Sequence, residues 1–129
     1  MISIRLVKPS EFNDVLNLIQ DIFPDADINI DEADTVLLAE YSGHVVGFVH
    51  VIDNDSSILI QGLGVRENLR GKGIGTMLMS AVFDMIKDDC RPVFVKARAL
   101  NPVMDLYARY GFILQRFGPT HVLVRRHNA

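Results

Sequence analysis

Apolar and polar residues follow two different periods along the first half of the chain. Residues 2–6 alternate as in a half-buried strand, whereas apolar residues over 10–22 recur at helical spacing. That helix is predicted to begin at a capping serine and to end before a proline. The runs 35–41 and 44–53 flank a Ser-Gly pair and predict a β-hairpin, and residues 57–65 predict a further strand.

The second half of the chain opens on a glycine-rich turn and a markedly apolar helix. The helix is predicted over residues 74–86, and its apolar positions indicate at least one buried face. Residues 93–97 follow as a strand, and residues 101–110 as a short helix that a left-handed glycine ends. Residues 112–117 and 121–126 predict two last strands. The order β-α-β-β-β-α-β-α-β-β indicates a mixed α/β sheet flanked by helices.

Length and composition limit the architecture and the compartment. A chain of 129 residues that is 49% apolar can build one core, so we expect a single domain over residues 1–129. Its one cysteine, Cys90, cannot form an internal disulfide, and we interpret it as structural. No apolar run approaches the roughly 18 residues of a membrane span, and the first residues do not resemble a secretion signal. We therefore expect a cytoplasmic protein with no membrane partner.

The net charge of −3 hides an uneven distribution along the chain. Residues 9–65 contain eleven acids and no Lys or Arg, whereas the part from Arg66 onward contains eleven Lys and Arg and five acids. One half should attract cations and the other anions, and the negative total argues against a nucleic-acid partner. The acidic segment 24–34 opens like a calcium loop, but Ile30 and Val36 replace the required Gly and Glu, so we expect no metal.

The glycine-rich turn carries the clearest sign of a ligand. Its glycines allow close approach to the backbone, and the helix that follows offers unpaired N–H groups and the positive end of its dipole. Arg70 and Lys72 add positive charge, and Thr76 offers a hydroxyl. Glycines alone would favour a tight strand-to-helix connection, but the flanking cations and the helix that follows favour a phosphate-binding site.

Two familiar phosphate motifs do not fit this turn. A nucleotide-triphosphate loop would need glycine in place of Arg66 and a hydroxyl residue in place of Gly73. A dinucleotide fingerprint would need its third glycine at Glu67, and the glycines of the turn are evenly spaced instead. The turn therefore belongs to another class of phosphate site.

Four segments together resemble the GNAT superfamily of N-acyltransferases. Residues 70–75 match its (Arg/Gln)-x-x-Gly-x-(Gly/Ala) pyrophosphate loop, and residues 63–65 match the strand end before that loop. Residues 101–112 match its Asn…Leu-Tyr…Gly-Phe segment, and residues 37–48 resemble its hairpin. The resemblance implies a mixed, mostly antiparallel central sheet of about six to seven strands with flanking helices. It also implies a splayed strand pair that binds coenzyme A, which a bulge near Gly62 or Gly64 would help to form.

The resemblance further implies an acetyltransferase that uses acetyl-coenzyme A as cosubstrate. The acetyl group would pass directly to a primary amine of a small molecule or peptide, with no metal and no covalent enzyme intermediate. Backbone N–H groups in the turn would hold the pyrophosphate, and the strand end would bond the pantetheine arm. The implied cofactor-binding residues are Leu63, Gly64, Val65, Arg70, Gly71, Lys72, Gly73, Ile74, Gly75, Thr76 and Asn101.

Tyr107 is the catalytic residue that the resemblance implies, because its hydroxyl could protonate the departing sulfur. By itself it would fit a half-buried aromatic held for packing. The base is open, since the family's glutamate is replaced here by Gln61 or Gly62. The amine could also arrive neutral, and a histidine such as the one at position 50 is more often a satisfied strand residue. The candidates left for the base are a water relay, Glu40, His50 and Asp53.

Two questions of function stay open at this stage. A non-catalytic acyl-coenzyme A-binding module of the same fold is the alternative to an enzyme, because the usual acid is missing. If the acidic segment lines the entrance, the acceptor should be cationic, such as a polyamine or a lysine-bearing peptide. The sequence does not choose between a monomer and a homodimer. The acids expected to steer the acceptor are Asp25, Asp27, Asp31, Glu32 and Asp34.

Overall fold

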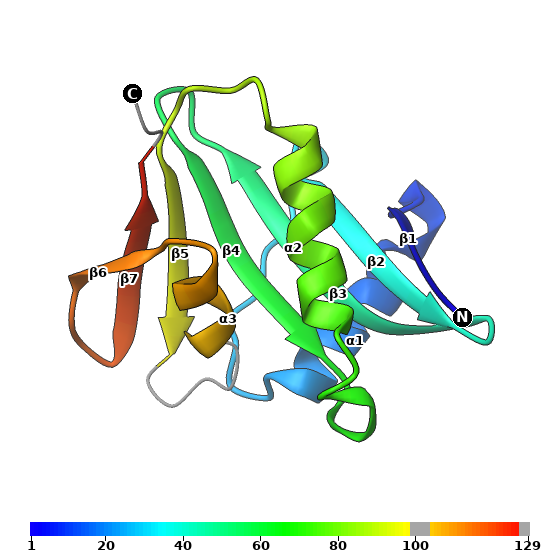
Figure 1. The fold of residues 1–129 in the computed structure, drawn as a ribbon. Helices are drawn as coiled ribbons and strands as arrows, with labels where there is room; N and C mark the ends of the chain where they lie inside the picture. Colours follow the sequence, from blue (N-terminus) through cyan, green and yellow to red (C-terminus); the bar gives the residue numbers. More distant parts are fainter. Residues whose placement is uncertain (99–103, 127–129) are drawn as a thin grey trace.

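A single seven-stranded sheet organises the protein. The structure is a computed structural model and describes residues 1–98 and 104–126. The strand order across the sheet is β1-β2-β3-β4-β5-β7-β6, and only β4 and β5 run parallel (Figure 1). This is the mostly antiparallel mixed sheet that the resemblance implies. The strands are β1 Ile2–Leu6, β2 Thr35–Tyr41, β3 His44–Asp53, β4 Ile58–Val65, β5 Val93–Arg98, β6 Ile113–Arg116 and β7 Thr120–Arg125.

Helices cover both faces of the sheet. Helices α2 (Ile74–Met85) and α3 (Met104–Arg109) lie in front of it in Figure 1, and α1 (Phe12–Ile22) lies behind. Two 3₁₀ turns, η1 (Pro9–Glu11) and η2 (Glu67–Leu69), precede α1 and the glycine turn. Among the described residues, no helix combines the length and apolar character that crossing a membrane requires.

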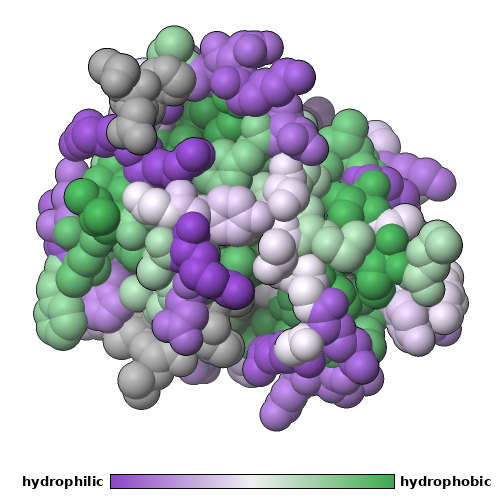
Figure 2. Space-filling model, viewed as in Figure 1, coloured by the Kyte–Doolittle hydropathy of each residue, from purple (hydrophilic) through white to green (hydrophobic). Residues whose placement is uncertain are grey.

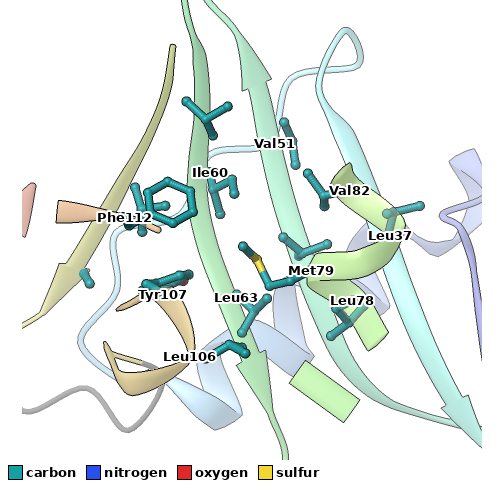
Figure 3. Close-up of a cluster of buried hydrophobic side chains, with 14 of the residues drawn as sticks. Leu37, Val51, Ile60, Leu63, Leu78, Met79, Val82, Leu106, Tyr107 and Phe112 are labelled. Carbon is teal, nitrogen blue, oxygen red and sulfur yellow. The ribbon is translucent and has the colours of Figure 1, made fainter. Parts of the chain in front are cut away.

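The two faces of the sheet bury separate apolar cores, because side chains alternate along each strand. On β2, Leu37 joins the core under α2, whereas Val36 and Leu38 join the core under α1. The larger core continues through Leu63 of β4 to α3 (Figure 3). Strands buried on both sides in this way explain the nearly continuous apolar runs in the sequence.

The hairpin and the first helix test two local predictions. Ser42 and Gly43 join β2 to β3 with φ of 52° and 78°, as a two-residue hairpin turn requires, so the predicted hairpin is confirmed. The predicted serine cap is wrong. Ser10 lies inside η1, and Glu11 is the residue that precedes α1. Because Pro9 begins a helical turn of its own, the Glu11 carboxylate folds back to accept the N–H of Lys8 at 2.8 Å.

The strand β4 bulges beside His50. In the pairing with β3, His50 lies opposite Gly62 and Val51 lies opposite Ile60, which leaves Gln61 as the extra residue. The bulge predicted near Gly62 is therefore confirmed. Because one residue is inserted, Ile60 before the bulge and Leu63 after it both join the core under α2.

The parallel strands β4 and β5 separate past Ile60. Their pairing covers three positions, from Ile58 opposite Val93 to Ile60 opposite Val95. From there to Val65 the rest of β4 has no strand partner on its β5 side among the described residues, although it still pairs with β3. The expected splayed strand pair is thus present, and β4 is followed by η2 and then by the glycine turn (Figure 1).

The far edge of the sheet is exposed. All residues of β6 are exposed, and this strand pairs with β7 alone. Ile113 and Leu114 present apolar side chains there, and Figure 2 shows apolar residues gathered at the left edge of the molecule, where Figure 1 places β6. The well-packed core therefore ends at β5 and β7, beside the separated strands.

Candidate active site

The glycine turn has a left-handed backbone at two positions. Gly71 and Gly73 have φ of 78° and 82°, and Gly73 is the residue that precedes α2. A Cβ at either position would meet no atom within 4 Å. Their role is therefore conformational, because an L residue disfavours this region even where space is free.

The first turn of α2 leaves donors unused at its N-terminus. The first hydrogen bond back into the turn runs from the N–H of Met77 to the carbonyl oxygen of Gly73, at 3.0 Å. The N–H groups before it have no partner within the helix, because an α-helix bonds each N–H to the fourth residue before it. They lie beside a cavity of about 350 Å³, the glycine-turn cavity. Its lining residues are Val65, Leu69, Arg70, Gly71, Gly73, Ile74, Gly75, Thr76, Asp105, Leu106 and Arg109.

Seven of the predicted cofactor residues line this cavity, and α3 adds residues that the sequence did not indicate. Asp105 and Arg109 lie one helical turn apart on α3, a spacing that could have suggested a shared face. Gly75 lets α3 approach, since a Cβ there would lie 3.1 Å from the Leu106 side chain. Lys72 is exposed beside the cavity and does not line it. Asn101 lies outside the described residues.

A second cavity, of about 430 Å³, occupies the place where β4 and β5 separate. We call it the Tyr107 cavity. Its walls come from α1 and the segment after it on one side, and from β3, β4, β5, α3 and β7 on the other. The lining residues are Ile19, Phe23, Ala26, Asp27, Ile28, Asn29, Phe48, His50, Ile52, Gln61, Gly62, Leu63, Lys96, Tyr107 and Thr120.

Tyr107 reaches this cavity from within the core. Its ring is 1% exposed, meets Phe112 edge-on at 5.8 Å between centroids, and lies beside β4 in Figure 3. Its hydroxyl makes no hydrogen bond to a described residue. Burial raises the pKa of the Tyr107 hydroxyl well above its usual value of 10, because the charged phenolate would lose its hydration. The group is therefore held protonated, as a proton donor must be.

The structure separates the three side chains considered as bases. Glu40 pairs with Arg5 at the β1 side of the sheet, and Asp53 pairs with Arg91 at 2.6 Å. Neither lines the Tyr107 cavity. His50 does line it, and its Nε2 lies 2.8 Å from Oδ2 of Asp34. Of these three, only His50 is in reach of chemistry at the separated strands.

Asp34 differs from the other acids expected to steer an acceptor. Its side chain is 9% exposed and faces His50, so it is not placed to attract an acceptor from solvent as the exposed acids are. The reason is the turn before β2, where Asp31 and Asp34 exchange backbone and side-chain hydrogen bonds that direct Asp34 inward. Asp27 and Glu32 are exposed, and Asp27 lines the Tyr107 cavity.

Comparisons with known proteins agree with this geometry. Among solved structures, a GNAT family acetyltransferase from Elizabethkingia anophelis with acetyl-CoA bound has a TM-score of 0.80 at 16% identity, over 97% of each chain. Naa50 of Arabidopsis thaliana, in complex with the bisubstrate analogue CoA-Ac-MVNAL, has 0.79 at 21%, over 96% of this chain and 97% of its own. The ribosomal-protein-S18-alanine N-acetyltransferase of Escherichia coli has 0.80 at 14%, over 96% and 91%. At these identities the likeness is one of fold.

A match at the level of sequence decides the family. Comparison with curated proteins finds no match. The family model described as the acetyltransferase (GNAT) family matches residues 6–112, which include the hairpin, the separated strands, the glycine turn and Tyr107. The chain therefore belongs to the GNAT acetyltransferase family.

Proposed function

We propose that this protein transfers the acetyl group of acetyl-coenzyme A directly to a primary amine. One observation carries the proposal: the end of β4 runs from the Tyr107 cavity, which Leu63 lines, to the glycine-turn cavity, which Val65 lines. A ligand could place an anionic group in the glycine-turn cavity and a reactive group in the Tyr107 cavity. It would then lie along the edge of β4 from which β5 has separated. Acetyl-coenzyme A has this layout, and the Elizabethkingia protein was solved with it bound.

The cosubstrate would be held mainly by backbone groups. N–H groups from Lys72 to Thr76 would bind the pyrophosphate at the start of α2, with Arg70 adding charge. Residues 63–65 would bond the amides of the pantetheine arm, which extends the sheet where β5 has moved away. Asn101 stays part of the proposed site.

The chemistry needs an attacking amine and a proton for the sulfur. The amine would enter the Tyr107 cavity and attack the thioester carbon, and the Tyr107 hydroxyl would donate a hydrogen bond and a proton to the departing sulfur. Because the hydroxyl has no competing hydrogen bond to a described residue, it is free to turn toward this atom. We assign Tyr107 as the catalytic acid on this ground.

The acceptor is proposed to be a cationic molecule or peptide. Asp27 lines the cavity, and Asp31 and Glu32 are exposed acids of the same segment after α1. The bisubstrate analogue of the Arabidopsis protein carries a peptide, and the Escherichia coli protein acts on an alanine of a ribosomal protein. A peptide or small-molecule amine is therefore the acceptor class to test first.

The deciding experiment measures thiol release from acetyl-coenzyme A with a panel of amines. The panel should include polyamines, lysine peptides, peptides with free N-termini and neutral amines, with an amine-free reaction as control. We expect release that depends on the amine. Tight binding of coenzyme A without release for any amine would instead favour a non-catalytic binding module, and failure to bind coenzyme A would refute the proposal altogether.

A further inference from the structure

A buried histidine of the Tyr107 cavity contacts a carboxylate, and neither group has a role in the chemistry proposed above. His50 is 2% exposed and lies between Phe48 and Ile52 on the face of β3 that lines the cavity. Buried histidines are uncommon without a partner, and here the partner is Asp34, from the turn before β2. The two residues are 16 positions apart in sequence and meet only in the folded protein.

The contact with Asp34 fixes which ring nitrogen of His50 carries the proton. The Asp34 carboxylate can only accept, so Nε2 of His50 must donate across the 2.8 Å separation. Oδ2 of Asp34 also accepts the backbone N–H of Asp31 at 3.0 Å, which holds the carboxylate in place. A neutral His50 therefore leaves Nδ1 as its unprotonated, proton-accepting nitrogen.

That nitrogen opens on the cavity. Nδ1 makes no hydrogen bond to a described residue, yet within residues 1–98 and 104–126 no fully buried side-chain nitrogen or oxygen lacks a partner. Nδ1 must therefore contact open space, and the space that His50 lines is the Tyr107 cavity.

His50 lies beside the position where the family carries its glutamate. The glutamate position corresponds here to Gln61 or Gly62, and His50 is the cross-strand partner of Gly62. Gly62 has no side chain to stand between His50 and the separated strands, and a Cβ there would already lie 3.4 Å from the Phe48 ring. A base at His50 would therefore lie one strand away from the family's glutamate, on β3 instead of β4.

We propose that His50 is the base that takes the proton from the acceptor ammonium, with Asp34 as its positioning residue. This inference rests on the acetyl transfer proposed above. Proton uptake at Nδ1, directly or through one water molecule, leaves a neutral amine and an imidazolium that the Asp34 carboxylate stabilises.

The protons balance over one turnover. The amine lone pair forms the C–N bond, the C–S bond breaks with its electrons on sulfur, and Tyr107 protonates the sulfur. The second proton of the attacking nitrogen restores the Tyr107 hydroxyl, and His50 returns the first proton to solvent. The products are the acetylated amine, free coenzyme A and one proton.

Other charged and titratable groups around His50 shape its pH dependence. The charged groups that face His50 are Asp34, the exposed Asp27 and Lys96 of β5, across the cavity. Tyr107 stays neutral over the working range. Because Asp34 is in direct contact with the ring, its removal should have the largest effect.

The test compares His50→Gln with His44→Gln, the same change at the exposed start of the same strand. His50→Gln should lower kcat/KM for an alkyl amine by about 10²-fold or more, and coenzyme A affinity should not change. The deficit should shrink at least tenfold with an acceptor that is neutral at the assay pH, such as hydroxylamine, because no proton needs to leave before attack. His44→Gln should match the parent protein.

A second variant tests the role of Asp34. Asp34→Asn should move the acid limb of the kcat/KM profile to lower pH, a shift that a purely structural role would not cause. Nitrogen-15 NMR of the parent protein should find the proton of neutral His50 on Nε2. This measurement does not depend on the folding of any variant.

Three results would overturn the proposal: a folded His50→Gln with kcat/KM within about threefold of the parent, a deficit equal for alkyl amines and hydroxylamine, or a proton on Nδ1. If no amine supports thiol release by the parent protein, the result counts against the proposed acetyl transfer and not against the contact between His50 and Asp34. The NMR result would then still report on the His50–Asp34 geometry.

Discussion

Arg70 donates a hydrogen bond from Nε to the backbone carbonyl oxygen of Val65, at 3.1 Å. The bond ties the start of the glycine turn back to the last residue of β4. Arg70 is exposed, and its terminal nitrogens make no hydrogen bond to a described residue. One side chain can thus both shape the turn and present charge to an anion.

The first prediction concerns Arg70→Ala. Losing a charge-assisted contact of roughly 1.5–3 kcal/mol should weaken coenzyme A binding by about 10- to 100-fold, measured by calorimetry. Arg116→Ala on β6, which removes the same charge from the far edge of the sheet, is the control and should leave binding unchanged. Equal affinities of the two variants would contradict the assignment of this turn.

The second prediction separates conformation from bulk at Gly73. Its φ of 82° costs an L residue about 1–2 kcal/mol, although no atom would block a Cβ there. Gly73→Val should therefore weaken coenzyme A binding strongly, whereas Gly73→Asn should retain more affinity because Asn tolerates the left-handed region. If both variants bind as the parent does, the turn does not need this backbone shape.

The third prediction concerns Tyr107→Phe. Packing is kept and the proton donor is lost, so turnover should fall by roughly 10²-fold if protonation of sulfur limits the rate, with coenzyme A affinity unchanged. Because burial raises the pKa of Tyr107, the parent should show no loss of activity from its ionisation up to about pH 10.

Tyr110→Phe, in the turn directly after α3, is the matched control. The Tyr110 hydroxyl lies 2.9 Å from Oγ of Ser80 on α2, so this variant should lose about 1 kcal/mol of unfolding free energy while turnover stays within a few fold. A Tyr107→Phe variant with full turnover under chemistry-limited conditions would leave Tyr107 as a packing residue.

The fourth prediction concerns stability in acid. Hydrogen bonds from the Arg5 guanidinium, and then from the Lys8 backbone, lower the pKa of Glu11 from 4.5 to about 2. The folded protein binds this proton less readily than the unfolded chain, so the stabilisation is full above about pH 4.5 and is lost as the pH falls toward 2. Glu11→Gln should unfold about 1 kcal/mol more easily at pH 7 and no more easily than the parent near pH 2, measured by urea unfolding. Glu32→Gln, an exposed acid in the segment after α1, should show no such dependence.

The fifth prediction concerns the acceptor. Attraction between exposed charges is screened over about 8 Å at physiological salt, so kcat/KM for a cationic acceptor should fall as salt rises. Changing Asp27, Asp31 and Glu32 to Asn or Gln should lower kcat/KM at low salt by several fold and flatten its salt dependence. A neutral or anionic amine as the best acceptor, or a triple variant equal to the parent at low salt, would exclude steering by these acids.

The sequence predicted most of the fold because helices, strands and turns are set by the spacing of apolar residues and by turn residues close together in the chain. The alternation of apolar and polar residues in β2 and β3 depends on residues close in sequence, and so does the Ser42-Gly43 turn. The same holds for Gly111, which ends the helix region after α3 with a left-handed φ of 86°. The cap of α1 was missed because a proline just before the expected serine starts a separate turn. Pro9 as the start of a turn and Ser10 as a helix cap are competing local signals, and the sequence pattern does not show which one prevails.

The site was less predictable, because its decisive contacts join distant segments. The pairing of His50 with Asp34 depends on how the segment after α1 folds back onto β3. The spacing of apolar and polar residues does not predict that contact. The contribution of Asp105 and Arg109 to the glycine-turn cavity depends on where α3 docks. Motif resemblance could supply the turn and Tyr107, but it could not supply a base that lies on a different strand from the family's glutamate.

The short pairing between β4 and β5 also bears on how quickly a ligand can arrive. Past Ile60 these two strands share no ladder hydrogen bonds, so a ligand that enters there has none to break. The edge of β4 is fixed on its other side by β3, and the turn that follows is fixed by Arg70. Association of coenzyme A should therefore be a single concentration-dependent step, without the plateau in observed rate that a slow conformational change before binding would impose.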